Sequence, residues 1–191
     1  MVTLNLTPNL SRYSSRGDPN PNPCSPNPLY NPSNPITVGD KGAAAIAEAL
    51  KTNAVLKELV IGAQSIGAAG ASALGEALKV NKVLKELSLT GNSIGDAGAT
   101  ALAAALRVNN ALTVLDARSC SIRTEGGKAI AEALEVNGGA GRALELTLMD
   151  NFIGGAGIAA IGKVLRPNAI TAPHLDAQVG RRSVRGAAEW V

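Results

Sequence analysis

The side chains that most often carry catalysis are few in this sequence. His174 is the only histidine among 191 residues, which excludes metal sites built from several histidines and leaves one imidazole as a candidate base. The two cysteines lie in unrelated contexts: Cys24 in a proline-rich stretch and Cys120 just after an expected strand. These residues do not compose a catalytic triad, so we expect a protein that is not an enzyme and that takes no cofactor.

Two glycine-rich runs, 66–70 and 153–157, have the composition of loops that cradle phosphate groups. Both lack the Lys-Ser/Thr pair of a P-loop, and neither has the spacing of a dinucleotide-binding fingerprint. They also occupy equivalent places in a repeating pattern. We therefore interpret them as turns of a repeat, with no bound nucleotide or metal.

A repeated leucine pattern organises the chain, and it is clearest between Val83 and Asn110. In that stretch Leu87 and Leu89 precede Asn92 in the spacing LxxLxLxxN, and a helical pattern of apolar residues follows. The same leucine returns at steps of 28, 28, 31 and 29 residues, at Leu59, Leu87, Leu115, Leu146 and Leu175. A period in the range of about 20–29 residues with this signature is typical of stacked strand–helix units.

The pattern resembles the leucine-rich repeat family in its long, ribonuclease-inhibitor-like form, and 38–180 is similar to the sensor repeats of NOD-like receptors. The resemblance implies an α/β solenoid with parallel strands on the concave face and helices on the convex face. Helices are wider than strands, so such an array must curve. We expect strands at 58–61, 86–89, 114–117, 145–148 and 174–177, and helices at 40–52, 68–80, 96–108, 124–136 and 155–166.

Composition divides the chain into three parts. Residues 1–37 hold eight of the ten prolines, and proline disfavours helix, so we interpret them as a leader rich in Pro and Asn. Within the leader, 1–9 fits either a degenerate first strand of the array or an accidental match. The solenoid is expected over 38–180, and 181–191 would form a short C-terminal tail or cap.

One polar position follows each expected strand at a fixed distance. Asn92 and Asn151 take it in two units and would satisfy backbone groups of the turn. Gln64 and Cys120 replace the asparagine in two others, so we expect those two turns to be bonded less tightly. This placement also predicts a structural role for the Cys120 thiol.

The residues between the leucines should point to the concave side, because side chains alternate along a strand. We predict a protein-binding face made of Glu58, Glu86, Ser88, Val114, Asp116, Arg118, Glu145, Thr147 and Asp176. Its five carboxylates stand against one arginine, so the expected partner is another protein with a basic surface.

An alternative function is the activation of a small GTPase, since proteins that activate Ran are similar in using the same long repeat. That activity would need a residue placed against the transferring phosphate. Arg118 and Arg123, which follow an expected strand, are the candidates.

The charge pattern narrows the classes of partner. The net charge is +3, but 40–168 carries 13 Lys/Arg against 12 Asp/Glu, a near balance that does not indicate nucleic-acid binding. No stretch has the apolar length of a membrane span, and the first twelve residues do not resemble a secretory signal. We expect a reduced, cytoplasmic protein that binds neither nucleic acid, membrane nor a small-molecule substrate.

Overall fold

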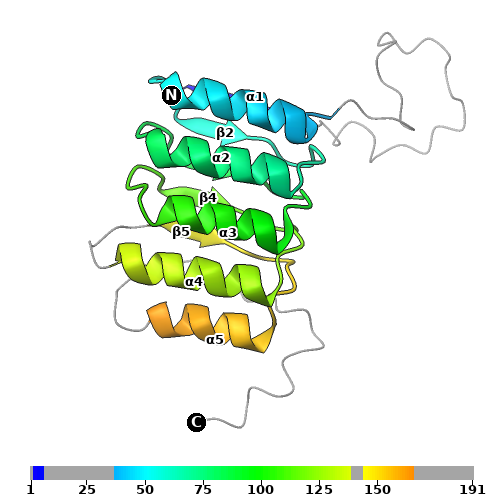
Figure 1. Ribbon diagram of the computed structural model, residues 1–191, viewed down its shortest axis with the longest axis vertical. Coiled ribbons are helices and arrows are strands. Elements are labelled where there is room, and N and C mark those ends of the chain that lie inside the picture. The colour runs from blue at the N-terminus through cyan, green and yellow to red at the C-terminus, as the bar shows by residue number, and fades with distance from the viewer. Residues whose placement is uncertain (1, 7–36, 139–143, 166–191) are drawn as a thin grey trace, which may run out of the picture.

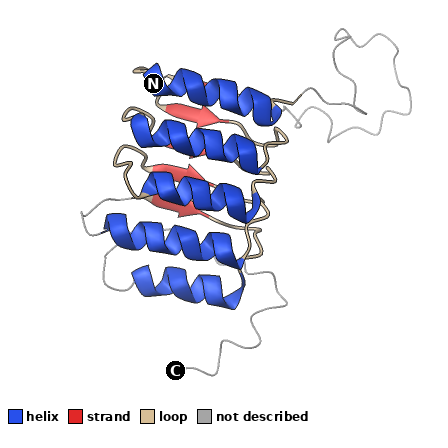
Figure 2. Cartoon of the chain, viewed as in Figure 1, coloured by secondary structure: helices blue, strands red, loops and turns tan. Residues whose placement is uncertain are grey.

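The computed structural model describes residues 2–6, 37–138 and 144–165, in which strands and helices alternate along the chain. The strands are β1 (Thr3–Asn5), β2 (Glu58–Val60), β3 (Glu86–Ser88), β4 (Val114–Asp116) and β5 (Glu145–Thr147). The helices are α1 (Gly39–Thr52), α2 (Ala68–Val80), α3 (Gly95–Leu106), α4 (Thr124–Gly138) and α5 (Gly154–Leu165). The helices stack in one row, and the strands form a second layer behind them (Figures 1 and 2).

The strands form one parallel sheet whose order, β1 to β5, is the order of the chain. Equivalent leucines are direct neighbours in the register, namely Leu4, Leu59, Leu87, Leu115 and Leu146. Parallel neighbours need a long crossover connection. From β2 onward one helix supplies each crossover, and it packs against the helices before and after it. The result is an α/β solenoid, as the sequence predicts.

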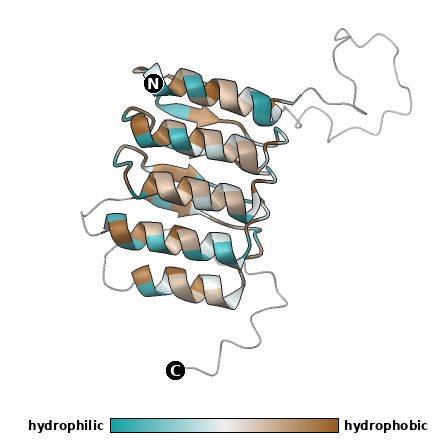
Figure 3. Ribbon diagram, viewed as in Figure 1, coloured by the Kyte–Doolittle hydropathy of each residue, from teal (hydrophilic) through white to brown (hydrophobic). Residues whose placement is uncertain are grey.

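Aliphatic side chains fill the space between the two layers. Leu59, Leu87 and Leu115 are at most 1% exposed, and leucines and alanines of the helices meet them from the other side. The helices can approach closely because small residues line their contacts. At Gly75 an added Cβ would lie 2.8 Å from the carbonyl oxygen of Ala101, so only glycine fits there. Figure 3 shows apolar residues both in the strands and along the helices.

The predicted elements are found close to their expected positions. Strands β2 to β5 each end one residue earlier than expected, and the helix ends agree within two residues. Helix α3 stops at Leu106 because the N–H of Val108 bonds to the carbonyl of Ala105, which tightens the last turn. The strand expected at 174–177 lies outside the described residues. None of the described helices is long and apolar enough to cross a membrane.

Strand β1 shows that the first residues of the chain belong to the sheet. The N–H of Leu6 donates to the carbonyl of Val60 at 2.8 Å, and the N–H of Lys57 donates to the carbonyl of Val2 at 3.1 Å. Thr3, Leu4 and Asn5 are in register with β2. Of the two interpretations of this segment, the degenerate first strand is the one found. The leader is therefore not a single unit, because its beginning is part of the array.

Asparagines at the ends of the helices form a buried ladder along one edge of the solenoid. Asn109 is 0% exposed, and its Nδ2 donates to the carbonyls of Leu78 and Asn81, one repeat earlier. Its Oδ1 accepts the N–H groups of Ala111 and Leu112 in its own turn. Asn81 makes the same four bonds. Each asparagine therefore closes its own turn and ties it to the preceding repeat.

Candidate functional site

The concave face is the exposed side of the sheet, opposite the helices. Since Leu59, Leu87 and Leu115 point into the core, the residues on either side of each point away from it. One column contains Glu58, Glu86, Val114 and Glu145, and the next contains Val60, Ser88, Asp116 and Thr147. Eight of the nine residues predicted for the site lie on this face or just beyond its strands. Asp176 lies outside the described residues.

The first column is acidic and largely uncompensated. Glu58 and Glu86 are direct neighbours in the parallel register, on strands about 4.8 Å apart. The hydroxyl of Thr3 donates to Oε2 of Glu58 at 2.6 Å. Glu86 and Glu145 have no ion-pair partner within the described ranges. Val114 lies between these two in the register and is half-buried. The column therefore carries negative charge on both sides of an apolar centre.

The second column contains an ion pair that corrects the predicted charge of this face. Nη2 of Arg118 lies 2.6 Å from Oδ2 of Asp116, and its Nε donates to both carboxylate oxygens at 3.0 and 3.1 Å. The hydrogen bond to Asp116, followed by the charge of that carboxylate, raises the pKa of Arg118. The charge of Asp116 is therefore neutralised locally. The acidity of the described face comes from the glutamate column alone.

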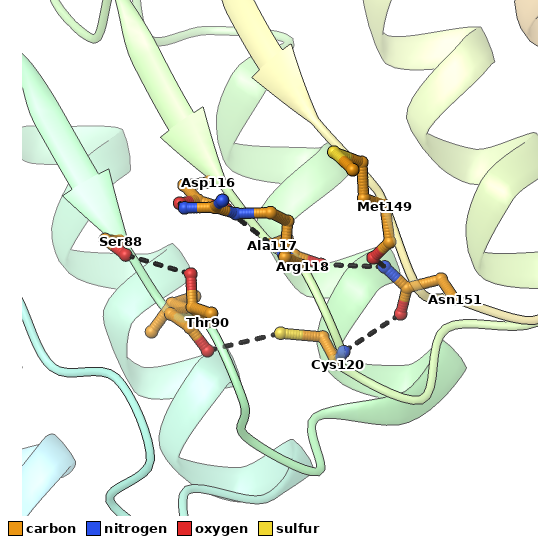
Figure 4. A network of polar contacts seen from close by, with 9 residues as sticks. Ser88, Thr90, Asp116, Ala117, Arg118, Cys120, Met149 and Asn151 are labelled. Atoms are coloured by element: carbon orange, nitrogen blue, oxygen red, sulfur yellow. Dashed lines mark hydrogen bonds and ion pairs between the residues drawn. The ribbon is translucent and has the colours of Figure 1, made fainter. Parts of the chain in front are cut away.

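Polar groups beyond the strand ends hold the rim of this face in place (Figure 4). Ser88 and Thr90 are linked through their hydroxyls at 3.2 Å. Asn151 accepts the N–H of Cys120 on Oδ1 at 3.0 Å and donates from Nδ2 to the carbonyl of Ala117 at 2.8 Å. Asn92 makes equivalent bonds one repeat earlier. These bonds fix the loop from which Arg118 extends.

The two substitutions in the asparagine row are better bonded than expected. Gln64 donates from Nε2 to the carbonyl of Leu6 at 2.7 Å and accepts the N–H of Val38 on Oε1 at 3.1 Å. Its longer side chain thus reaches both halves of the first repeat. The buried thiol of Cys120 donates to the carbonyl of Leu89 at 3.2 Å. The expectation of looser turns is therefore wrong, because the longer or softer side chains find the same kind of partner.

Cys120 has the structural role predicted for it. Burial raises the pKa of its thiol to about 11, which keeps it protonated near neutral pH. A thiol is nucleophilic only as the thiolate. Nor do the described residues contain a group of three or more metal-ligating side chains. The chemistry available on this face is therefore recognition through charge, hydrogen bonds and one apolar contact.

Two aspartates that the sequence analysis did not single out join the repeats in pairs. Oδ1 of Asp40, at the start of α1, accepts the N–H groups of Gly67 and Gly70 at the start of α2. Oδ1 of Asp96 in α3 does the same for Arg123 and Gly126 at the start of α4. The glycines make room for the carboxylates, because a Cβ at Gly70 or Gly126 would lie 2.7 Å from the accepting oxygen.

The turns that lead into the helices alternate in the same rhythm. Helices α1, α3 and α5 begin at glycines with positive φ, namely Gly39, Gly95 and Gly154. Before α2 and α4 the positive φ falls instead on Ser65 and Ser121. Arg123 can follow in the second type of turn because its own φ is not positive. Its side chain is exposed at this loop edge. The sequence signal was the Gly-Asp pair, which recurs in every second repeat.

Comparison with known proteins agrees with this architecture. A family model described as a leucine-rich repeat matches residues 80–103 and 108–131. A solved structure, described as leiomodin-1 actin-binding site 2, aligns with a TM-score of 0.56 and 24% sequence identity. That alignment covers 71% of this chain and 80% of the leiomodin chain, and at this identity it shows a common fold. No curated protein matches the sequence.

Proposed function

We propose that this chain, which is built of leucine-rich repeats, is a non-enzymatic protein-interaction module that binds a basic partner with its concave face. Domains of this type generally mediate contacts between proteins. The solved structure with the same fold is described as an actin-binding site, which is in keeping with such a role. Repeat steps near 28 residues and helices of 12–15 residues favour the ribonuclease-inhibitor-like form.

The observation that carries the proposal is the column of Glu58, Glu86 and Glu145 in the register of one parallel sheet. Like charges on neighbouring strands repel each other, and an arriving cation relieves that repulsion. The array is rigid at this face, because backbone bonds and the asparagine row hold the strands and their loops. A preorganised acidic surface favours fast association with a basic partner and an association rate that falls as salt increases.

Val114 gives the face an apolar centre. It interrupts the glutamates in the first column and is partly exposed. Binding energy in protein interfaces concentrates in desolvated central contacts, with polar groups around them. We propose that an aliphatic or aromatic side chain of the partner lies on Val114, with its cations against Glu86 and Glu145.

The remaining candidate groups have structural tasks in the folded chain. Arg118 is engaged by Asp116 through two of its nitrogens, and Cys120 is buried and protonated. These placements favour binding over catalysis. They also weaken the GTPase-activating alternative, which depended on Arg118 or Arg123 being available to a phosphate. The buried free thiol of Cys120 supports a reducing, cytoplasmic setting.

The test compares proteins captured from native extract by the wild-type chain and by a Glu86→Lys, Glu145→Lys variant. Proteins bound through the concave face should be lost from the variant and should dissociate from the wild type as salt is raised. A Glu48→Lys, Glu132→Lys variant is the matched control, because it makes the same change in net charge on the exposed convex surface.

Captured proteins that bind all three chains equally would place the interaction elsewhere on the molecule. A direct assay of GTP hydrolysis, with a panel of small GTPases and the Arg118→Ala variant, tests the enzymatic alternative separately. Stimulated hydrolysis that the variant loses would replace the proposal.

A further inference from the structure

A second surface, of opposite charge, lies along the edge where the helices end and the strands begin. Each helix runs back across the sheet, so these ends share one edge (Figure 1). We call it the basic edge. Its cations are Lys51, Lys57, Lys79, Lys82, Lys85 and Arg107, and its exposed apolar residues are Val55, Val80 and Val108.

The valines of the basic edge are unusual in their exposure and their regularity. Val80 and Val108 take the same place in consecutive repeats, directly before a buried asparagine, and are 58% and 53% exposed. Val136 takes that place in α4 and is 65% exposed. Val55 lies in the loop after α1 and is 59% exposed. Single exposed apolar side chains are ordinary, but a row repeated along one edge is typical of an interaction surface.

Half of the cations on this edge lack a carboxylate partner within the described chain. Lys51, Lys79 and Arg107 form ion pairs with glutamates of the convex face. None of the five ion pairs formed by the described residues involves Lys57, Lys82 or Lys85. Lys57 and Lys85 have the parity of the buried leucines, so their side chains leave the strands on the side away from the glutamate column. The basic edge and the acidic face are therefore separate surfaces.

The backbone beneath the basic edge is held firmly. The buried amides of Asn81 and Asn109 bind each turn to the one before it. Nζ of Lys82 donates to the carbonyls of Lys79 at 3.1 Å and Val108 at 3.4 Å, so it bridges two repeats. The valines and lysines thus stand at fixed intervals, and little ordering is needed when a partner binds.

We propose that the basic edge docks an extended acidic segment of a partner protein that carries an apolar side chain at every third position. Neighbouring helices in an array lie about 8–10 Å apart. An extended polyproline-type chain rises about 3.1 Å per residue with three residues per turn, or about 9 Å per turn. One apolar side chain per turn can therefore meet one valine per repeat, while the intervening carboxylates face the lysines.

The single-file arrangement favours a linear segment over a membrane. A lipid surface has no register and would need a broad basic plane, whereas this edge offers one valine per helix end. The inference does not rest on the function proposed for the concave face, because the two surfaces bear opposite charge and share no residue.

The probe is a fluorescein-labelled peptide of four Val-Asp-Glu units, whose binding to the chain is followed by fluorescence anisotropy at about 0.15 M salt. A Lys57→Glu, Lys85→Glu variant should bind it about tenfold more weakly, and a Val80→Ser, Val108→Ser variant should also lose affinity. All four side chains are exposed, so these variants should fold as the wild type does. A Lys41→Glu, Arg123→Glu variant makes the same charge change at the opposite edge and should bind within about twofold of the wild type.

Two further arms separate the alternatives. A peptide of the same composition with its valines grouped at one end should bind clearly more weakly, and equal binding would overturn the proposed register. The Glu86→Lys, Glu145→Lys variant should keep its affinity for the probe, which separates this proposal from the concave-face function. Failure of the wild type to bind the probe would overturn the proposal. So would binding to phosphatidylserine vesicles that depends on Lys57 and Lys85 while the peptide does not bind.

Discussion

Replacing Asn109 by alanine should cost far more stability than the same change at Asn53, although both residues end a helix in the same register. Asn109 is fully buried and makes four described bonds, two to carbonyls of the preceding repeat and two from its own turn. Asn53 is exposed, and its Oδ1 accepts N–H groups only from Val55 and Leu56.

The magnitude follows from the groups that alanine leaves behind. A buried polar group without its partner costs about 1–3 kcal/mol, so four such groups set an upper range of about 4–12 kcal/mol. Water that enters the small cavity satisfies part of this demand, and losses above about 4–5 kcal/mol are exceptional. We therefore expect Asn109→Ala to lower the free energy of unfolding by about 3–5 kcal/mol. Asn53→Ala should lower it by about 0.5–1 kcal/mol, because its turn is open to solvent.

Urea unfolding followed by circular dichroism measures both losses, and hydrogen exchange locates them. The amides of Ala111 and Leu112 should lose protection in the Asn109 variant, whereas those near Asn53 should not. Since each repeat contacts only its neighbours, the transition could also separate into two steps at this junction. Equal losses for Asn109→Ala and Asn53→Ala would refute the argument.

The Asn109→Asp variant adds a test of the donor side. Its carboxylate can still accept the two N–H groups but would face the carbonyls of Leu78 and Asn81, so the folded state should favour the protonated acid. A folded pKa above the unfolded value of about 3.9 means that this stability is lost as pH rises above about 4. Relative to wild type, the variant should therefore be weaker at pH 7.5 than at pH 5. The opposite order would contradict the assigned orientation of the amide.

Three further predictions concern the core, the turns and the thiol. Leu87→Ala should cost about 2–5 kcal/mol and Glu86→Ala under about 0.5 kcal/mol in chemical denaturation, and equal losses would mean that the strand faces the other way. Gly95 has a φ of +60° with open space around its Cα, so Gly95→Ala should destabilise by about 1–2 kcal/mol through backbone strain alone. Gly162→Ala, in a helix with equal space, should instead stabilise by up to about 1 kcal/mol in the same assay, and a loss there would show that the space is filled. Because its pKa is raised to about 11, Cys120 should resist iodoacetamide at pH 8 in the folded chain and react after unfolding, and rapid labelling of the folded chain would contradict its burial.

The positions of the strands and helices followed from the sequence because one physical demand repeats. Leu87 and its equivalents must be buried at a constant interval, and that interval determines both the strand and the helix that returns. The concave column of glutamates followed in turn from the alternation of side chains. The start of the first repeat could be described only as two alternatives, because a match of nine residues does not reveal whether Leu4 packs against Leu59.

Contacts between repeats were harder to predict than the repeats themselves. The pair of Asp116 and Arg118 was within reach of the sequence, since residues two apart share a strand face. The Gln64 bonds were not, because the partner carbonyl of Leu6 lies 58 residues away, across the proline-rich stretch. The same holds for the Asp96 carboxylate, whose partners belong to the next helix. Side-chain reach across a junction depends on distances that a one-dimensional pattern does not contain.

The carboxylates that cap a following helix have a consequence for how such an array can grow. Asp40 and Asp96 lie 56 residues apart, so the capped helices occur once in every two repeats. Duplicating a single 28-residue unit would place two turns of one type side by side and leave one helix start without its acceptor. Duplicating a pair would preserve every cap. The heritable building block of this chain, and the one that a protein engineer should copy, is therefore the double repeat.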